Sequence, residues 1–225
     1  MTVPALADHL VIATPDLDSA VDALTDQIGV RPSPGGKHPG IATQNHLLSL
    51  SDSCYLEVIG PDPSQPAPDF PRPFGIDDLT EAKLVTWAIH VTDLEGRIES
   101  ARAGGYDPGE IMPLSRQSPD GLLEWRLTTR PERAAGGIVP FLIDWGQTPS
   151  PALASAKGCS LLDLRAEHPD PDEVPLVRPR RCRRRRGLCR GRCPPPAAGR
   201  RRHPRPGPAH AGGHRALVVI HAQGS

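Results

Sequence analysis

Two residues in short apolar segments have the side chains best suited to chemistry, a histidine and a glutamate. His9 stands in "DHLVIATPDLD" at residues 8–18, and Glu57 stands in "SCYLEVIG" at residues 53–60. A glutamate that faces a protein interior without a partner has a raised pKa and can accept a proton. The structural alternatives are that Glu57 is solvated and that His9 hydrogen-bonds a backbone carbonyl at a strand end.

Three further polar candidates lie in "GGKHPGIATQNHL" at residues 35–47, namely His38, Asn45 and His46. Adjacent residues of a strand face opposite sides. We therefore expect one of Asn45 and His46 to contact a ligand and the other to pack or to face water. His38 follows a stiff turn and is another candidate contact.

The second half of the chain offers an arginine as a candidate anchor. Arg126 alternates with apolar residues and shares its strand face with Glu124 and Thr128. We expect it to anchor an anionic ligand, with a surface ion pair as the alternative. Ser115 and Arg116, in "LSRQSPDG", are interpreted as a turn before they are interpreted as a binding loop.

The elements that position these residues follow from a repeat with a period of 77 residues. The segment "VTWAIHVTDLE" at 85–95 repeats residues 8–18, with Asp93 in place of Asp16 but Thr86 in place of His9. The first copy predicts a strand at 9–14, a helix over 17–28 capped by Asp16, an extended segment bending at Gly35 and Gly36, and strands at 43–50 and 53–60.

The second copy repeats this order after a proline-rich connection. It predicts a strand at 84–91, a helix capped by Asp93, and strands at about 109–115, 122–129 and 138–145. A third start follows, with a strand at 158–166. We therefore divide the chain into paired units over 1–150 (1–62 and 84–150, linked by 63–83), the beginning of a third unit at 151–174, and a tail at 175–225.

Charge divides the chain near residue 175. All 26 acidic residues lie at or before Glu173, whereas 14 of the 26 basic residues lie in 178–215. The acidic first part argues against a nucleic-acid-binding surface there. The N-terminus resembles no secretion signal, no segment is long and apolar enough to span a membrane, and Cys54 and Cys159 are isolated. These features predict a cytoplasmic protein without membrane partners.

A tandem strand–helix–three-strand unit resembles the vicinal oxygen chelate superfamily of glyoxalases, bleomycin-resistance proteins and dioxygenases. More narrowly, "GGKHPGIATQNHLLSL", "PFGID", "SRQSPDG", "EWRL" and "PFLIDWG" resemble its glyoxalase-like family. The resemblance covers residues 6 to about 174. It implies an α+β fold in which two βαβββ modules form a cupped half-barrel, followed here by a truncated third unit.

The resemblance also implies where a metal would lie. Each module supplies a His or Gln from its first strand and a Glu from its last strand, a set that suits Zn, Ni, Mn or Fe. His9 and Glu57 match the first module. In the second module Thr86 is a weak ligand, and either Ile143 or Asp144 falls opposite Glu57, depending on the alignment. The expected site is therefore incomplete, with His90 as a candidate recruit from the strand face of Thr86.

The tail admits three interpretations. Its 14 arginines suit a nucleic-acid-binding arm. Cys182, Cys189 and Cys193 with His203 are candidate zinc ligands, although their spacing matches no common zinc motif. We favour a third interpretation, a shift of the reading frame near residues 174–180, which would leave a segment without regular structure.

Two functions follow from the resemblance. The first is an enzyme of lyase, isomerase or dioxygenase type acting on a small polar metabolite, with Glu57 as base or ligand, His9 as ligand or proton donor, and Arg126 and Asn45 orienting the substrate. The second is a metal-free protein that sequesters a ligand without chemistry. A homodimer is the expected assembly in either case, and nucleic acid is not expected as a partner.

Overall fold

The computed structural model of the chain describes residues 7–118, 121–130, 134–168, 174 and 215–222. Both copies of the repeat form the predicted βαβββ order. The first copy contains β1 (Ala7–Ala13), α1 (Leu17–Ile28), β2 (Ser33–His38), β3 (Thr43–Ser51) and β4 (Cys54–Pro61). The second contains β5 (Lys83–His90), α2 (Leu94–Ala103), β6 (Glu110–Ser118), β7 (Gly121–Thr129) and β8 (Phe141–Asp144).

The two helices begin at the aspartates that the repeat singled out. The Asp16 carboxylate accepts a hydrogen bond from the Ser19 backbone N–H at 3.1 Å, and Asp93 accepts from the Gly96 N–H at 3.0 Å. Each bond satisfies a backbone donor that the first helical turn leaves without a partner. At the other end of α1, Gly29 adopts the left-handed conformation with φ 73°, which favours glycine.

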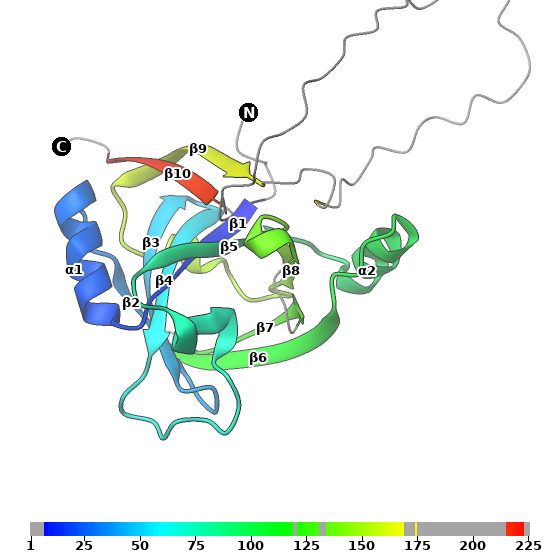
Figure 1. The fold of residues 1–225 in the computed structure, drawn as a ribbon, viewed down its shortest axis with the longest axis horizontal. Helices are drawn as coiled ribbons and strands as arrows, with labels where there is room; N and C mark the ends of the chain where they lie inside the picture. The colour runs from blue at the N-terminus through cyan, green and yellow to red at the C-terminus, as the bar shows by residue number, and fades with distance from the viewer. Residues whose placement is uncertain (1–6, 119–120, 131–133, 169–173, 175–214, 223–225) are drawn as a thin grey trace, which may run out of the picture.

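All eight strands of the two copies form one sheet with the order β2-β3-β4-β1-β5-β8-β7-β6. Within each copy the first strand runs parallel to the last, β1 to β4 and β5 to β8, and the copies join where β1 and β5 pair antiparallel. The sheet curls until its edge strands β2 and β6 approach each other (Figure 1). The predicted bend at Gly35 and Gly36 is an irregularity inside β2 instead of a turn.

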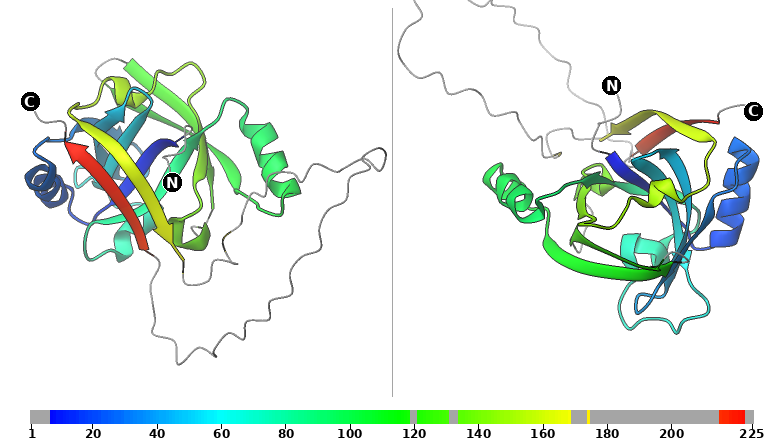
Figure 2. Two further views of the ribbon diagram at one scale, coloured as in Figure 1. Left: turned by 90° about the horizontal axis from the view of Figure 1, so that it is seen from above. Right: turned by 180° about the vertical axis from the view of Figure 1, so that it is seen from behind.

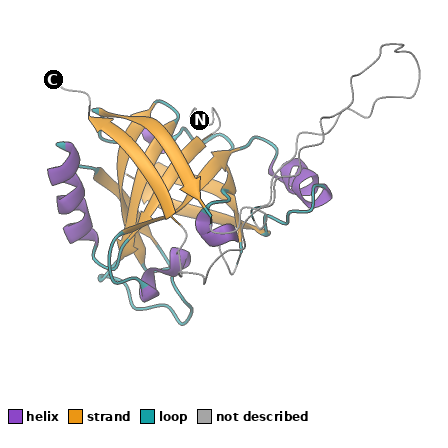
Figure 3. Ribbon diagram, turned by 45° about the horizontal axis from the view of Figure 1, so that its top comes forward, coloured by secondary structure: helices purple, strands orange, loops and turns teal. Residues whose placement is uncertain are grey.

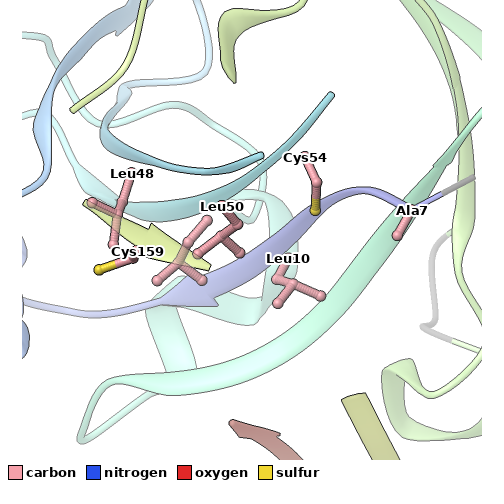
Figure 4. Close-up of a cluster of buried hydrophobic side chains, with 7 residues drawn as sticks. Ala7, Leu10, Leu48, Leu50, Cys54 and Cys159 are labelled. Atoms are coloured by element: carbon pink, nitrogen blue, oxygen red, sulfur yellow. The ribbon is translucent and has the colours of Figure 1, made fainter. Parts of the chain in front are cut away.

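The curled sheet has an outer apolar face and an inner face with both polar and apolar groups. Leu10, Leu48 and Leu50 point outward and pack with Cys54 and Cys159 in a buried cluster (Figure 4). Helix α1 covers this outer face, and α2 lies beside β8, so the helices remain outside the sheet (Figure 3). Helices α1 and α2 leave the inner face to the strands and to the 3-10 helix Pro73–Asp78, and this face carries four of the predicted polar candidates, His9, Glu57, His38 and Asn45.

The strand predicted at 158–166 is present as β9 (Cys159–Glu167), which lies across the outer face next to β3. The tail departs from expectation in one place. Residues Arg215–Ala222 form β10, which pairs antiparallel with β9 (Figure 2), so this apolar segment does have regular structure. The candidate zinc ligands of the tail and the helix expected after Asp170 lie outside the described residues. None of the described helices has the length and apolarity needed to cross a membrane.

The connection after β4 is held by a buried aspartate. Asp62 accepts hydrogen bonds from the Ser64 and Gln65 side chains and lies 3.4 Å from the Lys37 ammonium. Burial raises the pKa of Asp62, but these hydrogen bonds and the lysine outweigh it and lower the pKa to about 2. The ionised carboxylate therefore stabilises the folded state above a pH of about 4, the ordinary pKa of aspartate.

This stabilisation should disappear as the pH falls through about 2. We expect the stability of the wild type to decrease more steeply with acid than that of Asp62→Asn, which has no carboxylate to protonate. Urea denaturation of both proteins at a series of acidic pH values measures the difference. A difference in stability that stays constant over this pH range would contradict the assignment.

Candidate functional site

The polar cluster of the inner face begins with two adjacent residues of β1. Asp8 is fully buried at an irregularity in the pairing of β1 with β5, and its Oδ1 lies 2.6 Å from Nδ1 of His9. A carboxylate only accepts hydrogen bonds, so Nδ1 of His9 carries the proton and Nε2 points away from Asp8. The backbone carbonyl expected as the partner of His9 is thus replaced by the Asp8 side chain.

Asp8 has two further neighbours from the second copy. Its Oδ2 accepts a hydrogen bond from the indole Nε1 of Trp145 at 3.0 Å and lies 3.5 Å from Nδ1 of His90. His90 is half exposed, whereas His9 is 3% exposed. His90 therefore joins the cluster through Asp8 rather than beside Glu57.

Glu57 faces the other nitrogen of the histidine ring. It is buried on β4, and its Oε1 accepts a hydrogen bond from Nδ2 of Asn45 at 2.5 Å. Its Oε2 lies 3.8 Å from Nε2 of His9, which is too long for a direct hydrogen bond. Asp8, His9 and Glu57 consequently form a row in which Nε2 of His9 and Oε2 of Glu57 are neighbouring atoms.

Asn45 connects this row to two more polar side chains. Its Oδ1 accepts a hydrogen bond from Nη1 of Arg116 at 3.4 Å, and its Nδ2 lies 3.5 Å from Nε2 of His38. The other ring nitrogen of His38 is 2.9 Å from the Thr43 hydroxyl. Burial lowers the pKa of His38, Glu57 opposes this and Arg116 adds to it, so the ring is neutral at neutral pH.

Arg116 belongs to the cluster although the sequence analysis interpreted its segment first as a turn and only second as a binding loop, and Asp8 was not among the predicted site residues. Arg116 lies on β6, which extends three residues beyond the predicted strand, and it is 5% exposed. Burial lowers the pKa of its guanidinium, and the proximity of Tyr55 and Glu57 opposes that shift. The alternation of Met112, Leu114 and Arg116 on one strand face was the available signal, since it continues through the segment interpreted as a turn.

Two predicted contacts lie elsewhere. His46 is bonded through Nδ1 to the Pro32 carbonyl at 3.1 Å, on the strand face opposite to Asn45. Arg126 donates hydrogen bonds to Glu95 of α2 at 2.6 Å and to Asp144 at 2.7 Å. The expected anchor Arg126 therefore ties β7 to α2 outside the cluster, because its neighbour Trp125 takes the inward-facing position.

Aromatic rings surround the row on the inner face. The Tyr55 ring stacks on His9 with centroids 4.7 Å apart, and Phe141 meets His9 edge to face at 5.4 Å. Phe74, from the 3-10 helix Pro73–Asp78, packs against Phe141 at 6.2 Å. Burial raises the pKa of Tyr55, and Asp8 and Glu57 raise it further, so its phenol stays protonated. The row thus lies in a largely apolar environment in which charge interactions are strengthened.

The strand registers identify the counterpart of Glu57 in the second copy. Val11 lies opposite Glu57 in the parallel pair β1–β4, and Ala88 lies opposite Phe141 in the parallel pair β5–β8. The period of 77 residues carries Val11 onto Ala88. Phe141 is therefore the structural equivalent of Glu57.

This result corrects both candidates from the sequence. Neither Ile143 nor Asp144 occupies the position, because Phe141 lies 84 residues after Glu57 instead of 77, so the second copy is longer than the first between its first and last strands. The antiparallel register of β1 and β5 agrees with this equivalence. His9 pairs with Ala88 and Val11 pairs with Thr86, so Thr86 corresponds to His9 just as Ala88 corresponds to Val11. The second copy thus presents a hydroxyl and a phenyl ring where the first presents an imidazole and a carboxylate.

The donor set does not fit a resident divalent metal. Zinc and related ions take three or more protein donors, and neither a phenyl ring nor, in practice, a threonine hydroxyl serves as one. Within the part of the chain that the structure describes, no three His, Cys, Asp or Glu side chains are placed to hold an ion. His9 and Glu57 supply two donors, and Phe141 occupies the side from which another would come.

A curled sheet of two βαβββ units with polar residues on its inner face defines a protein of the vicinal oxygen chelate fold. Residues 7–176 match the family model of the glyoxalase-like domain, and this chain belongs to that family. No functionally curated protein matches it.

One of the solved structures with detectable similarity supports the fold. A hypothetical protein from Staphylococcus aureus shares 16% identity with a TM-score of 0.52, over 71% of this chain and 68% of that protein. Methylmalonyl-CoA epimerase from Mycobacterium tuberculosis shares 20% identity over 68% of this chain and 96% of its own, with a TM-score of 0.43. The epimerase from Streptomyces coelicolor, in complex with 2-nitronate-propionyl-CoA, shares 19% identity over 64% and 97%, also with a TM-score of 0.43. These similarities indicate no substrate.

Proposed function

We propose that this chain is a small-molecule enzyme of lyase or isomerase type that moves a proton on its ligand without a resident metal. The observation that carries the proposal is the row Asp8–His9–Glu57, with separations of 2.6 and 3.8 Å. A buried carboxylate at Nδ1 holds the imidazole in one orientation and leaves Nε2 for proton transfer, as in other acid–base sites. Cytoplasmic location and a homodimer remain expectations that accompany this proposal.

The proposed step is removal of a proton from a carbon next to a carbonyl group. The C–H bond breaks, its proton passes to the Glu57 carboxylate, and its electron pair moves onto the carbonyl oxygen to form an enolate. Protonated His9 then donates one proton from Nε2 to the ligand, and Glu57 passes the proton that it took to Nε2 of His9, which returns both groups to their starting states. With His9 protonated, the charges of Asp8, His9, Glu57 and Arg116 sum to zero, which reduces the cost of burying them.

The second candidate is a protein that binds and sequesters its ligand without chemistry. The observation that favours it is Phe141, which puts an aromatic ring where a catalytic carboxylate would complete the symmetry of the two copies. Trp125 and Trp145, with centroids 5.3 Å apart, extend this aromatic surface. Such a surface suits binding of a flat apolar ligand.

Exchange of ligand hydrogen for deuterium separates the two candidates. Small 2-oxo acids, aldehydes and acyl thioesters are incubated with the protein in D2O, and loss of the α-proton signal is followed by NMR. We expect exchange with the wild type and a decrease of about 100-fold or more in Glu57→Gln and His9→Gln. His46→Gln is the matched control, because this histidine lies outside the cluster, and it should exchange at the wild-type rate.

The outcomes decide between the functions. A ligand that shifts the indole resonances of Trp125 without any exchange would favour sequestration. Exchange that persists in Glu57→Gln would contradict the role given to the carboxylate.

A further inference from the structure

A buried arginine reaches the first unit of the fold from the second. Arg116 belongs to the edge strand β6, and the curl of the sheet brings it to β3 and to the opposite edge strand, β2. Its Nη1 donates to Oδ1 of Asn45 at 3.4 Å. On the inner face of the sheet, the side-chain amide of Asn45 therefore lies between the guanidinium of Arg116 and the carboxylate of Glu57.

The charge of Arg116 is not neutralised by a direct partner within the described residues. None of their carboxylates lies within 4.0 Å of the guanidinium, whereas Arg126 has two such partners. Asn45 stands between the two charges, since its Nδ2 bonds Glu57 and its Oδ1 bonds Arg116. A buried guanidinium has five donors and is costly unless acceptors satisfy them. A direct ion pair with Glu57 would be the simpler solution, and the amide prevents it.

The backbone beside Arg116 leaves room for the guanidinium. A Cβ added to Gly35 would lie 2.9 Å from Nη1 of Arg116 and 2.3 Å from Oδ1 of Asn45. These separations are shorter than non-bonded atoms allow, so any larger residue at position 35 would displace both side chains. Glycine at this position in β2 thus permits the arrangement of Asn45 and Arg116.

We propose that Arg116 is the oxyanion-binding residue of this site, and that its ligands are small carbonyl compounds with a carboxylate or enolisable oxygen. The inference rests on the proposed function and names its substrate class. When Glu57 takes a proton from the ligand carbon, negative charge moves from the carboxylate to the ligand oxygen. Arg116 receives that charge through N–H groups that are already oriented, and a planar guanidinium matches a carboxylate or enediolate in two parallel hydrogen bonds.

Oxalate tests this assignment because it is a planar dianion shaped like an enediolate, and oxamide is its uncharged counterpart. Binding of each to the full-length protein is measured by calorimetry in the presence of a chelator, which removes adventitious metal. We expect the wild type to bind oxalate and to bind oxamide more weakly. Arg116→Met should bind oxalate about thirtyfold or more weakly than the wild type. Arg126→Met, which removes an exposed arginine outside the cluster, should remain within about twofold of the wild type.

A second variant keeps the test decisive if Arg116→Met does not fold. Gly35→Ala retains the guanidinium but displaces it, so it should also weaken oxalate binding. Wild-type protein that binds no oxalate, or variants of Arg116 and Gly35 that bind it unchanged, would overturn the assignment. Hydrogen–deuterium exchange keeps the two proposals distinguishable. Exchange without oxalate binding would support proton transfer by Glu57 and contradict the role of Arg116. Oxalate binding that depends on Arg116, without exchange, would support the anion site and contradict the proposed enzyme function.

Discussion

Asp8→Ala is expected to lower the free energy of unfolding by about 3–5 kcal/mol, the range found when one partner of a buried charged network is removed. Asp8 is completely buried, and its two oxygens accept from His9 and Trp145. Alanine would leave both N–H groups in an apolar interior without an acceptor, and each such group costs about 1–3 kcal/mol. The cavity left by the carboxylate adds to this loss.

Urea denaturation of the full-length protein measures the effect. Asp8→Asn should be less destabilised than Asp8→Ala, because its amide oxygen still accepts from one of the two donors. Asp22→Ala is the matched control. This aspartate pairs with Arg31 at the surface, 2.6 Å away, and its loss should cost about 1 kcal/mol or less. Equal stability of the Asp8 and Asp22 variants would show that Asp8 contributes no more to the free energy of unfolding than a surface ion pair does.

Installing the missing donors should convert the site into a metal centre. We expect Thr86→His combined with Phe141→Glu to raise affinity for Zn²⁺ or Ni²⁺ by at least about 100-fold, which corresponds to about 2.7 kcal/mol. The physical reason is that four donors from two equivalent pairs satisfy the coordination that two donors cannot. Phe141 already contacts His9, so a carboxylate at position 141 would enter the same space.

Elemental mass spectrometry and competition with a chelating dye measure this change. The wild type and each single variant should contain far less metal than the double variant. Adding His9→Ala to the double variant should remove the metal again, whereas adding His46→Gln should not. Stoichiometric metal in the wild type that disappears in both His9→Ala and Glu57→Ala would contradict the statement that the present donor set does not fit an ion.

Most of the fold could be predicted from the sequence because its signals are local. Strand alternation, the capping residues Asp16 and Asp93 and the terminating Gly29 depend on a few neighbouring residues, and they predicted both βαβββ units. The repeat of 77 residues predicted that the units are equivalent. It also showed that Thr86 stands for His9, which the register of β1 and β5 confirms. An apolar segment in the tail, 215–222, was the local signal that went unnoticed, and it forms β10.

The composition of the site was decided by tertiary structure. His9 and Glu57 lie close together because β1 and β4 are neighbours within one unit, an arrangement that the family resemblance implied. Phe141 took the position of the fourth donor because extra residues in the second copy between β6 and β8 shifted the register of β8, and such a shift leaves no trace in local alternation. Arg116 joined Asn45 and Gly35 because the sheet curls until β6 approaches β2. Curvature accumulates over eight strands, and no segment of the sequence specifies it alone.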